Sequence, residues 1–278
     1  MIIKKSLTTF NICIDTSQRL YLLMNCYRKL EVFSTCKQCR ISPYCLISKN
    51  CDIHSACYDF DREDRVFLRK QKLFMQNEQI TYAYILKQGL IKTYTISEDG
   101  DEDIIGFHYP GDIIALDNLH LEKYSYFAEI SADSIVCQVN KNVIYDKLNI
   151  SNYLSSQLVL KQELLRILSK CSVKEKVSHY LISHSLKLGV LGHPLVSFNL
   201  GFKRSDITNY LGITIETMSR ALTELKRLGV INNTGSCITI LKQNELEANC
   251  SALSMSMFKK KSAYISTVFI EPINRDLT

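Results

Sequence analysis

Two short helical patterns separated by a glycine constrain the fold of this chain more than any other feature. Residues Ser205–Leu211 and Thr214–Leu228 each show helical spacing of apolar residues, and Gly212 between them suits a tight turn that a side chain would crowd. Ile231–Ile240 then has the pattern of a β-hairpin. The positions expected to fill the interior of the helix pair are apolar: Ile207, Leu211, Ile213, Met218 and Leu222. Residues 173–241 are therefore predicted to form a winged helix-turn-helix.

One face of the second helix carries Glu216, Ser219 and Arg220, three polar residues at three- and four-residue spacing. Side chains near the start of such a helix can reach base edges in the major groove of DNA. An arginine can donate two hydrogen bonds to guanine, and a glutamate can accept one from cytosine. The alternative is a solvated helix face without a role, but the surrounding motif favours a DNA-binding element.

Upstream of this element, residues 58–150 alternate between short apolar runs and turn signals. The runs are rich in Ile, Tyr, Phe and Val: Ile80–Leu86, Leu90–Ile96, Ile104–His108 and Ile135–Val139. Turns are indicated at Glu98–Asp101 and at Tyr109–Asp112. Closely spaced short strands of this kind predict a small antiparallel barrel or roll, so the expected fold class is α+β.

A helix is predicted over 151–172, where a leucine repeat marks a narrow packing seam. The seam residues, which we expect to form a dimer contact, are Leu154, Leu158, Lys161, Leu165 and Leu168. Lys161 occupies a position that the pattern reserves for an apolar residue. In a twofold dimer Lys161 would meet its own copy, so we hypothesise that like-charge repulsion there opposes dimerisation. The alternative is that Lys161 reaches solvent or pairs with Gln157 or Glu163 of the other helix.

The chain contains 11 cysteines, and seven of them precede residue 60. The N-terminus carries no recognisable export signal, so we expect a cytoplasmic protein whose thiols stay reduced. Cys36, Cys39 and Cys45 form a compact set that predicts a metal or cluster site. Their spacing does not separate zinc from an iron–sulfur cluster, because both accept four cysteines. Cys51 or Cys57 could replace one ligand, and unliganded thiols are the plain alternative.

Charge and hydropathy narrow the class of protein only a little. The net charge is +6, and there is no apolar run of about 18 residues that would predict a membrane-spanning helix. No nucleotide-binding loop or pair of catalytic carboxylates is recognisable, which argues against an enzyme. An electron carrier that uses a cluster is the alternative from another class, but it would leave the helix-turn-helix unexplained. Residues 1–34 are interpreted as an N-terminal arm, 35–57 as a cysteine-rich segment and 242–278 as a tail of unknown role.

The segment Arg204–Arg220 resembles the helix-turn-helix of the CRP/FNR family of transcription regulators, and Glu216-Thr-Met-Ser-Arg220 resembles its FNR branch. Ile91–Asp112 resembles the matching stretch of the FNR sensory domain. The resemblance covers about residues 35–241. It implies a β-roll sensor similar to cyclic-nucleotide-binding domains, a long dimerisation helix and a C-terminal winged helix-turn-helix.

The resemblance also implies how such a protein would meet its partners. Glu216, Ser219 and Arg220 would contact a TTGAT half-site in an inverted repeat of double-stranded DNA, and the protein would act as a homodimer. The acidic turn Glu98–Asp103 would contact RNA polymerase. The alternative for that turn is a solvated hairpin without a partner.

Cys137, in the context Val136-Cys137-Gln138-Val139, matches the position of the fourth cluster ligand in the FNR branch. The resemblance therefore implies a [4Fe–4S] cluster that oxygen dismantles. Its ligands would be Cys36, Cys39, Cys45 and Cys137. A zinc ion on the same four thiols is the alternative.

Many members of the superfamily bind cyclic AMP, and this sequence argues against that ligand. A buried cyclic phosphate needs a positive partner, usually arginine, and no arginine occurs between Arg69 and Arg166. Lys123 lies near the place where the family's arginine is expected and is the alternative partner. Haem would need histidine ligands, for which the candidates are His54, His108 and His120.

Overall fold

The computed structural model describes most of the chain after residue 61. The described residues are 36, 39, 41, 42, 45, 62–142, 144, 150–189 and 197–250. The chain divides into Met1–Thr35 and Cys36–Thr278, and the first of these units lies outside the described residues. So do Cys51, His54 and Cys57, and so does the tail after residue 250. None of the described helices is both long and apolar enough to cross a membrane.

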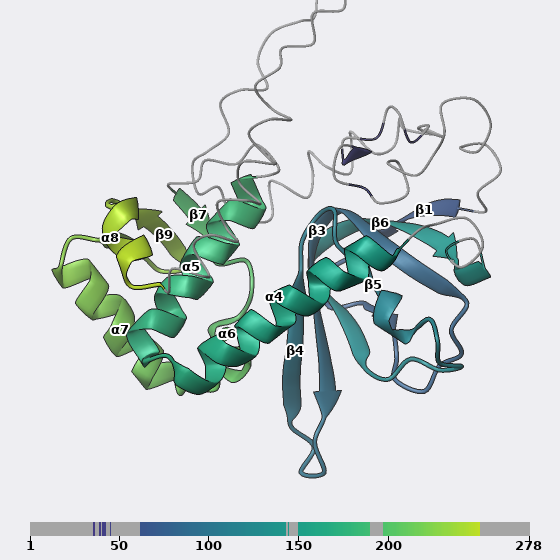
Figure 1. Cartoon of the computed structure of the whole chain (residues 1–278), viewed down its shortest axis with the longest axis horizontal. Coiled ribbons are helices and arrows are strands. Elements are labelled where there is room, and N and C mark those ends of the chain that lie inside the picture. The colour runs from purple at the N-terminus through teal and green to yellow at the C-terminus, as the bar shows by residue number, and fades with distance from the viewer. Residues whose placement is uncertain are drawn as a thin grey trace, which may run out of the picture. The chain divides into compact units, whose positions relative to one another are not determined.

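The first described domain is built on one antiparallel sheet of six strands, as far as the described residues show. The strand order is β1-β6-β3-β4, with β2 paired to β6 and β5 paired to β3. The strands are β1 (Arg62–Phe67), β2 (Lys72–Phe74), β3 (Tyr82–Ile96), β4 (Glu102–His108), β5 (Ile113–Ile114) and β6 (Phe127–Asn140). In Figure 1, β3 and β4 form a long hairpin whose tip carries the acidic turn. A short 3-10 helix, η3 (Leu116–Asn118), follows β5.

Strand β3 differs from the sequence prediction, which placed two separate strands at Ile80–Leu86 and Leu90–Ile96. The structure has one 15-residue strand, because Gly89 produces an irregularity in the pairing with β6 rather than a turn. Gly89 adopts a φ of +99°, and a Cβ there would lie 2.1 Å from Ser134 Oγ. Only glycine allows this backbone conformation at so close an approach, so the strand continues through the position.

Two helices follow the sheet. α4 (Ser151–Lys170) lies close to the range predicted for the dimerisation helix, and α5 (Val173–Gly189) follows it after a short break. α4 is the longest of the described helices. Its 20 residues span about 30 Å. Its inward side includes the buried Ile167 and Glu163, whereas several of its leucines are exposed.

The C-terminal domain has the predicted helix pair and hairpin, together with a short strand before them and a short helix after them. Its elements are β7 (Ser197–Asn199), α6 (Arg204–Leu211), α7 (Ile215–Arg227), β8 (Ile231–Thr234), β9 (Cys237–Ile240) and α8 (Gln243–Ala248). The three strands form a sheet in the order β7-β9-β8. Leu246 of α8 is fully buried in the core of this domain, although the sequence offered no usable pattern for the segment after residue 241.

Candidate DNA-binding surface and sensor sites

The start of α7 is fixed by a side-chain cap. Thr214 has an extended backbone, and its hydroxyl accepts a hydrogen bond of 3.1 Å from the backbone N–H of Thr217. The turn before it is made by Gly212, whose φ of +62° is left-handed. This arrangement ends α6 and begins α7 within a few residues, as a helix-turn-helix requires.

The three predicted base-contacting residues share the outer side of α7. The inner side is buried, and its core residues are Met218, Ala221, Leu222 and Leu225. The side chains of Glu216 and Arg220 are more than four-fifths exposed, and their charged groups lie 3.8 Å apart. Ser219 is partly exposed between them. The exposed face can therefore present an acceptor, a hydroxyl and a guanidinium to a DNA groove.

Two further basic residues tie the helix pair to the hairpin, and sequence analysis gave neither of them a role. Arg204, at the start of α6, donates a hydrogen bond of 2.7 Å to the carbonyl of Gly235 at the hairpin turn. Lys226, near the end of α7, donates to the carbonyl of Asn233 at 3.3 Å. Both bonds are exposed, and together they hold the β8–β9 hairpin against the helix pair.

The four predicted cluster ligands gather in one hydrophobic cluster with the interior of the sheet. Cys36, Cys45 and Cys137 are buried there, and Cys39 packs against the cluster from its edge. The backbone N–H of Cys39 donates to the carbonyl of Cys36, which makes a tight turn in the cysteine segment. Cys137 comes from β6, where it pairs across the sheet with Ile85 of β3.

The thiols supply the right chemistry for a soft metal, but they do not form a metal-holding group as they stand. Among the described residues, no set of three or more Cys, His, Asp or Glu side chains lies close enough to hold a metal ion. Lys87 lies near two of the cysteines. Burial lowers its pKa, but a hydrogen bond to Asp64 and the charges of Cys39 and Cys137 outweigh this effect, so the pKa is raised.

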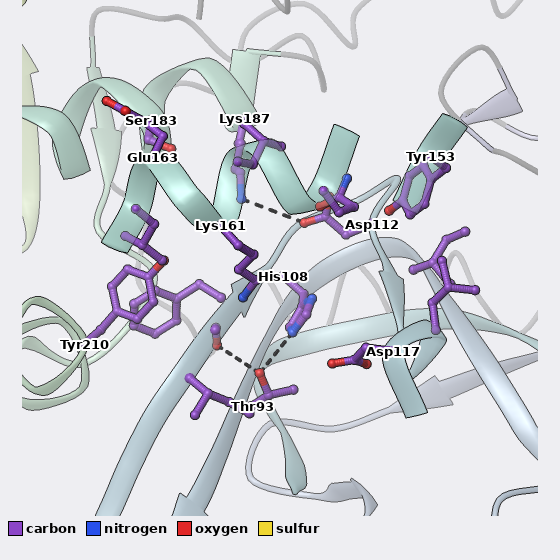
Figure 2. A pocket seen from close by; sticks show the side chains of 18 of the residues that line it. Thr93, His108, Asp112, Asp117, Tyr153, Lys161, Glu163, Ser183, Lys187 and Tyr210 are labelled. Atoms are coloured by element: carbon purple, nitrogen blue, oxygen red, sulfur yellow. Dashed lines mark hydrogen bonds and ion pairs between the residues drawn. The ribbon is translucent and has the colours of Figure 1, made fainter. Parts of the chain in front are cut away.

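A cavity of about 290 Å³ lies between β4 and the helices α4 and α5, with one side chain from α6. Its lining includes two basic side chains, Lys161 and Lys187, and three acidic ones, Asp112, Asp117 and Glu163. Lys187 lies 3.9 Å from the carboxylate of Asp112. Figure 2 shows the Lys161 side chain directed toward His108.

His108 is a neutral group at the floor of this cavity. Burial lowers the pKa of His108 to about 4. Its Nε2 lies 3.1 Å from the hydroxyl of Thr93, which also donates to the carbonyl of Gly106 (Figure 2). His120, another residue considered for haem, is exposed. The nitrogen groups of the cavity lining thus include two lysines and two neutral imidazoles, because burial also lowers the pKa of His179 to about 4.

Two family models match the chain. A cyclic nucleotide-binding domain model matches residues 64–151, and a Crp-like helix-turn-helix domain model matches residues 175–248. The chain is 32% identical over 219 residues to the anaerobic regulatory protein of Aggregatibacter actinomycetemcomitans, covering 71% of this chain and 85% of that protein. The chain belongs to the CRP/FNR family. It is a DNA-binding transcription regulator of the FNR group of anaerobic regulators, not an enzyme.

A second similar protein and a solved structure support the CRP/FNR assignment. The regulatory protein HlyX of Actinobacillus pleuropneumoniae is 32% identical over 225 residues, covering 76% of this chain and 92% of that protein. The structure of FixK2 from Bradyrhizobium japonicum matches with a TM-score of 0.57 at 23% identity, covering 69% of this chain and 98% of that one. The predicted fold class, with β-roll, long helix and winged helix-turn-helix, is confirmed.

The cavity also bears on the ligand of this CRP/FNR protein. Although the sensor has the fold of a cyclic nucleotide-binding domain, no arginine is among the described residues that line the cavity. Lys123 is exposed and is not part of the lining. The lining therefore lacks the guanidinium that would offset a buried cyclic phosphate.

The leucine seam of α4 divides between two surroundings. Leu154, Leu158 and Leu165 have exposures of 39%, 60% and 65%. Leu168 packs against the core shared with the C-terminal domain, and Lys161 lines the cavity. The single chain of this CRP/FNR regulator thus leaves an apolar stripe on α4 open to solvent.

Proposed function

We propose that this regulator is a cytoplasmic homodimer that senses oxygen through a [4Fe–4S] cluster and binds a TTGAT-type inverted repeat. The observation that carries the sensing part is that Cys137 of β6 shares one hydrophobic cluster with the three cysteines near residue 40, with Cys39 at its partly buried margin. The names of the similar proteins, an anaerobic regulatory protein and a fumarate and nitrate reduction regulatory protein of Vibrio cholerae at 31% identity, support the same function.

Cys36, Cys39, Cys45 and Cys137 are the residues that would hold the cluster. When bound, the cluster supplies a redox-sensitive group that oxygen can destroy. The chain's own contribution is to join two pieces of structure, because three of the thiols lie in the cysteine segment and the fourth lies on β6. Ligation would therefore fasten that segment against the sensor sheet and stabilise the fold as structural metal sites do.

The DNA-binding part of the proposal rests on the exposed face of α7. Arg220 would donate to guanine, Glu216 would accept from cytosine, and Ser219 would contact a base or a phosphate. The exposed leucines of α4 would form the dimer contact, so that two copies of α7 meet two half-sites. The acidic turn Glu98–Asp103 at the tip of the β3–β4 hairpin would contact RNA polymerase.

The test is anaerobic purification with iron and sulfide analysis and visible absorption spectroscopy. We expect a brown wild-type protein that bleaches in air, and we expect the Cys137→Ser variant to lose the absorbance. Cys237→Ser, which changes a partly buried cysteine in the C-terminal domain, is the matched control and should keep it. Full iron content in Cys137→Ser would assign the fourth ligand to Cys51 or Cys57. A colourless protein with stoichiometric zinc would replace the cluster by the zinc alternative.

A further inference from the structure

The edge strand of the sensor sheet is covered by the first helix of the helix-turn-helix. β4 lies at the edge of its sheet, so some of its backbone groups have no neighbouring strand. The N–H of Ile104 donates instead to the side-chain oxygen of Asn209 on α6, at 2.7 Å. An unpaired strand edge is an open hydrogen-bonding site, and here α6 satisfies part of it.

A buried lysine lies beside this contact. The Lys92 side chain on β3 is 2% exposed and forms an ion pair with Glu102 of β4. Its ammonium group also lies 3.4 Å from the carboxylate of Asp206 on α6, and 3.9 Å from that of Glu129 on β6. Burial lowers the pKa of Lys92, but these carboxylates outweigh burial and raise it, so the ammonium stays charged.

Aromatic side chains extend the same junction. Phe107 of β4 contacts Phe202 and Tyr210, with ring centroids 4.1 Å and 4.9 Å apart. Phe202 precedes α6 and Tyr210 belongs to it, so these contacts hold the same helix. α6 in turn shares its core with α7, through Ile207 and Met218.

We propose that Lys92 is a positioning residue for DNA binding. Its buried ammonium group pairs with carboxylates of the sensor and with Asp206 of α6. These ion pairs hold α6 against the sensor, and α7 is held with it because the two helices share a core. In a dimer this would set the separation of the two base-contacting helices. The inference rests on the proposed dimer and inverted repeat, but its structural core, the Lys92 junction, stands apart from the cluster.

Asp206 has an alternative explanation, because an acidic residue in the first turn of a helix is favourable without any partner. That role would need no contact with the sensor and would leave Asp206 in solvent. Its side chain is instead 11% exposed and faces a lysine that is itself buried. A buried ammonium without its carboxylates is strongly unfavourable. The ion pair therefore stabilises both the buried position of Lys92 and the position of α6 on the sensor.

The experiment compares Lys92→Met with wild type on three DNA duplexes, under the conditions in which the wild type binds. The duplexes carry the inverted repeat, the same repeat with two base pairs inserted between the half-sites, and one half-site. We expect the insertion to weaken wild-type binding by about tenfold or more, and Lys92→Met binding by less than about threefold. The affinity of Lys92→Met for the single half-site should stay within about twofold of the wild-type affinity. Lys123→Met, which removes an exposed sensor lysine, should behave as wild type.

Hydrogen exchange supplies a readout that needs no DNA. The amide of Ile104 should exchange about tenfold faster in Lys92→Met, while amides in the centre of α7 keep their protection. Asn209→Ala changes an exposed residue and should raise Ile104 exchange in the same way, so the junction can be tested even where Lys92→Met folds poorly.

Wild-type spacer dependence in a folded Lys92→Met variant, with Ile104 still protected, would overturn the proposal. So would a variant that only melts at a lower temperature and keeps the wild-type preference for spacing, because that result assigns Lys92 a structural role. A wild-type protein that binds the repeat and the single half-site equally would contradict the proposed dimer function instead, and Ile104 exchange would still decide the Lys92 junction.

Discussion

At the scale of residues, α7 separates side chains that build the protein from side chains that are free to meet DNA. Met218 and Leu222 are almost fully buried, whereas Glu216 and Arg220 are among its most exposed residues. The exposed ion pair between these two residues contributes little to stability, because exposed pairs are screened by water and salt. Their side chains can therefore exchange this contact for contacts to bases at small cost.

Replacing Arg220 by alanine tests that view. We expect Arg220→Ala to weaken binding to the inverted repeat by roughly 1–3 kcal/mol, and to weaken binding to unrelated DNA much less, because a guanine contact is lost. The measurement is a fluorescence-anisotropy titration at fixed salt. Arg227→Ala, at the exposed end of the same helix, is the control for loss of charge. Equal losses on both DNAs would make Arg220 a phosphate contact.

At the scale of elements, strand β3 depends on one glycine. Gly89→Ala would place a Cβ 2.1 Å from Ser134 Oγ and 2.5 Å from the carbonyl oxygen of Asp133. Since the backbone of Asp133 is part of β6, the strands would have to move apart, and we expect a loss of roughly 1–3 kcal/mol in unfolding free energy. Urea denaturation measures it.

Gly100 supplies the matched control for this prediction. It also has a positive φ, of +87°, but a Cβ there would meet nothing within 4 Å. Gly100→Ala should therefore cost only the conformational strain, about 1 kcal/mol. Similar losses at Gly89 and Gly100 would show that crowding against β6 is not what requires glycine in β3.

The leucine seam of α4 carries the second prediction at this scale. Lys161 lies between the exposed leucines of α4, and its side chain lines the cavity in the single chain; two copies turned toward a dimer axis would repel by about 1 kcal/mol. We expect Lys161→Leu to shift cluster-free protein from monomer toward dimer in air and to raise its affinity for the inverted repeat. Sedimentation velocity measures the shift.

Lys187→Leu is the control for this change, since it removes the other lysine of the cavity without touching α4. If Lys187→Leu also dimerises, the cavity and not the seam controls association. A wild-type protein that is already dimeric without a cluster would contradict the role given to Lys161.

Some of these elements could be predicted from the sequence and others could not. The helix pair was predictable because Gly212 and the capping residue Thr214 act locally. The continuity of β3 was not, because Gly89 looks like a turn until its contact with β6 is known. Helix α8 was missed because its six residues are too few to show a period, and only the burial of Leu246 reveals its role.

The sites divide in the same way. Three clustered cysteines are visible from spacing alone, whereas Cys137 could be proposed only through resemblance, since it is some ninety residues away. The contact between Lys92 and Asp206 joins residues more than a hundred positions apart, and the pattern around neither residue indicates the other as its partner. Ion pairs of that kind follow from how two domains pack, which local patterns do not encode.

At the scale of the whole molecule, stability should depend on a buried histidine at the domain junction. His184 of α5 is 1% exposed, and its Nε2 donates to the carbonyl of Asn199 at 3.0 Å. Its Nδ1 then accepts from the hydroxyl of Tyr109, at 2.7 Å. Burial lowers the pKa of His184 to about 4, so the folded protein holds this imidazole neutral.

The direction of the pH effect follows from this lowered pKa. The unfolded chain takes up a proton near pH 6.5 and the folded chain only near pH 4, so the stabilisation is complete above about pH 6.5 and is lost as the pH falls toward 4. The loss is on the order of 3 kcal/mol for this residue. Urea denaturation between pH 8 and pH 4 should show a shallower decline for His184→Gln, which does not titrate. Parallel declines would assign the acid sensitivity to other groups.

The pairing of β6 with β1, β2 and β3 also sets when the sensor sheet can form during translation. The sensor sheet cannot close until residue 140 has been synthesised, because β6 is the strand with which β1, β2 and β3 pair. Cys45 leaves the ribosome about ninety residues before Cys137, which is roughly 5 to 20 seconds at ordinary rates of translation. During that interval three thiols of each nascent chain wait without their fourth neighbour. On the proposed four-cysteine site, loading of the cluster would therefore follow translation of the sensor, so that newly made chains would pass through an unloaded state before they could respond to oxygen.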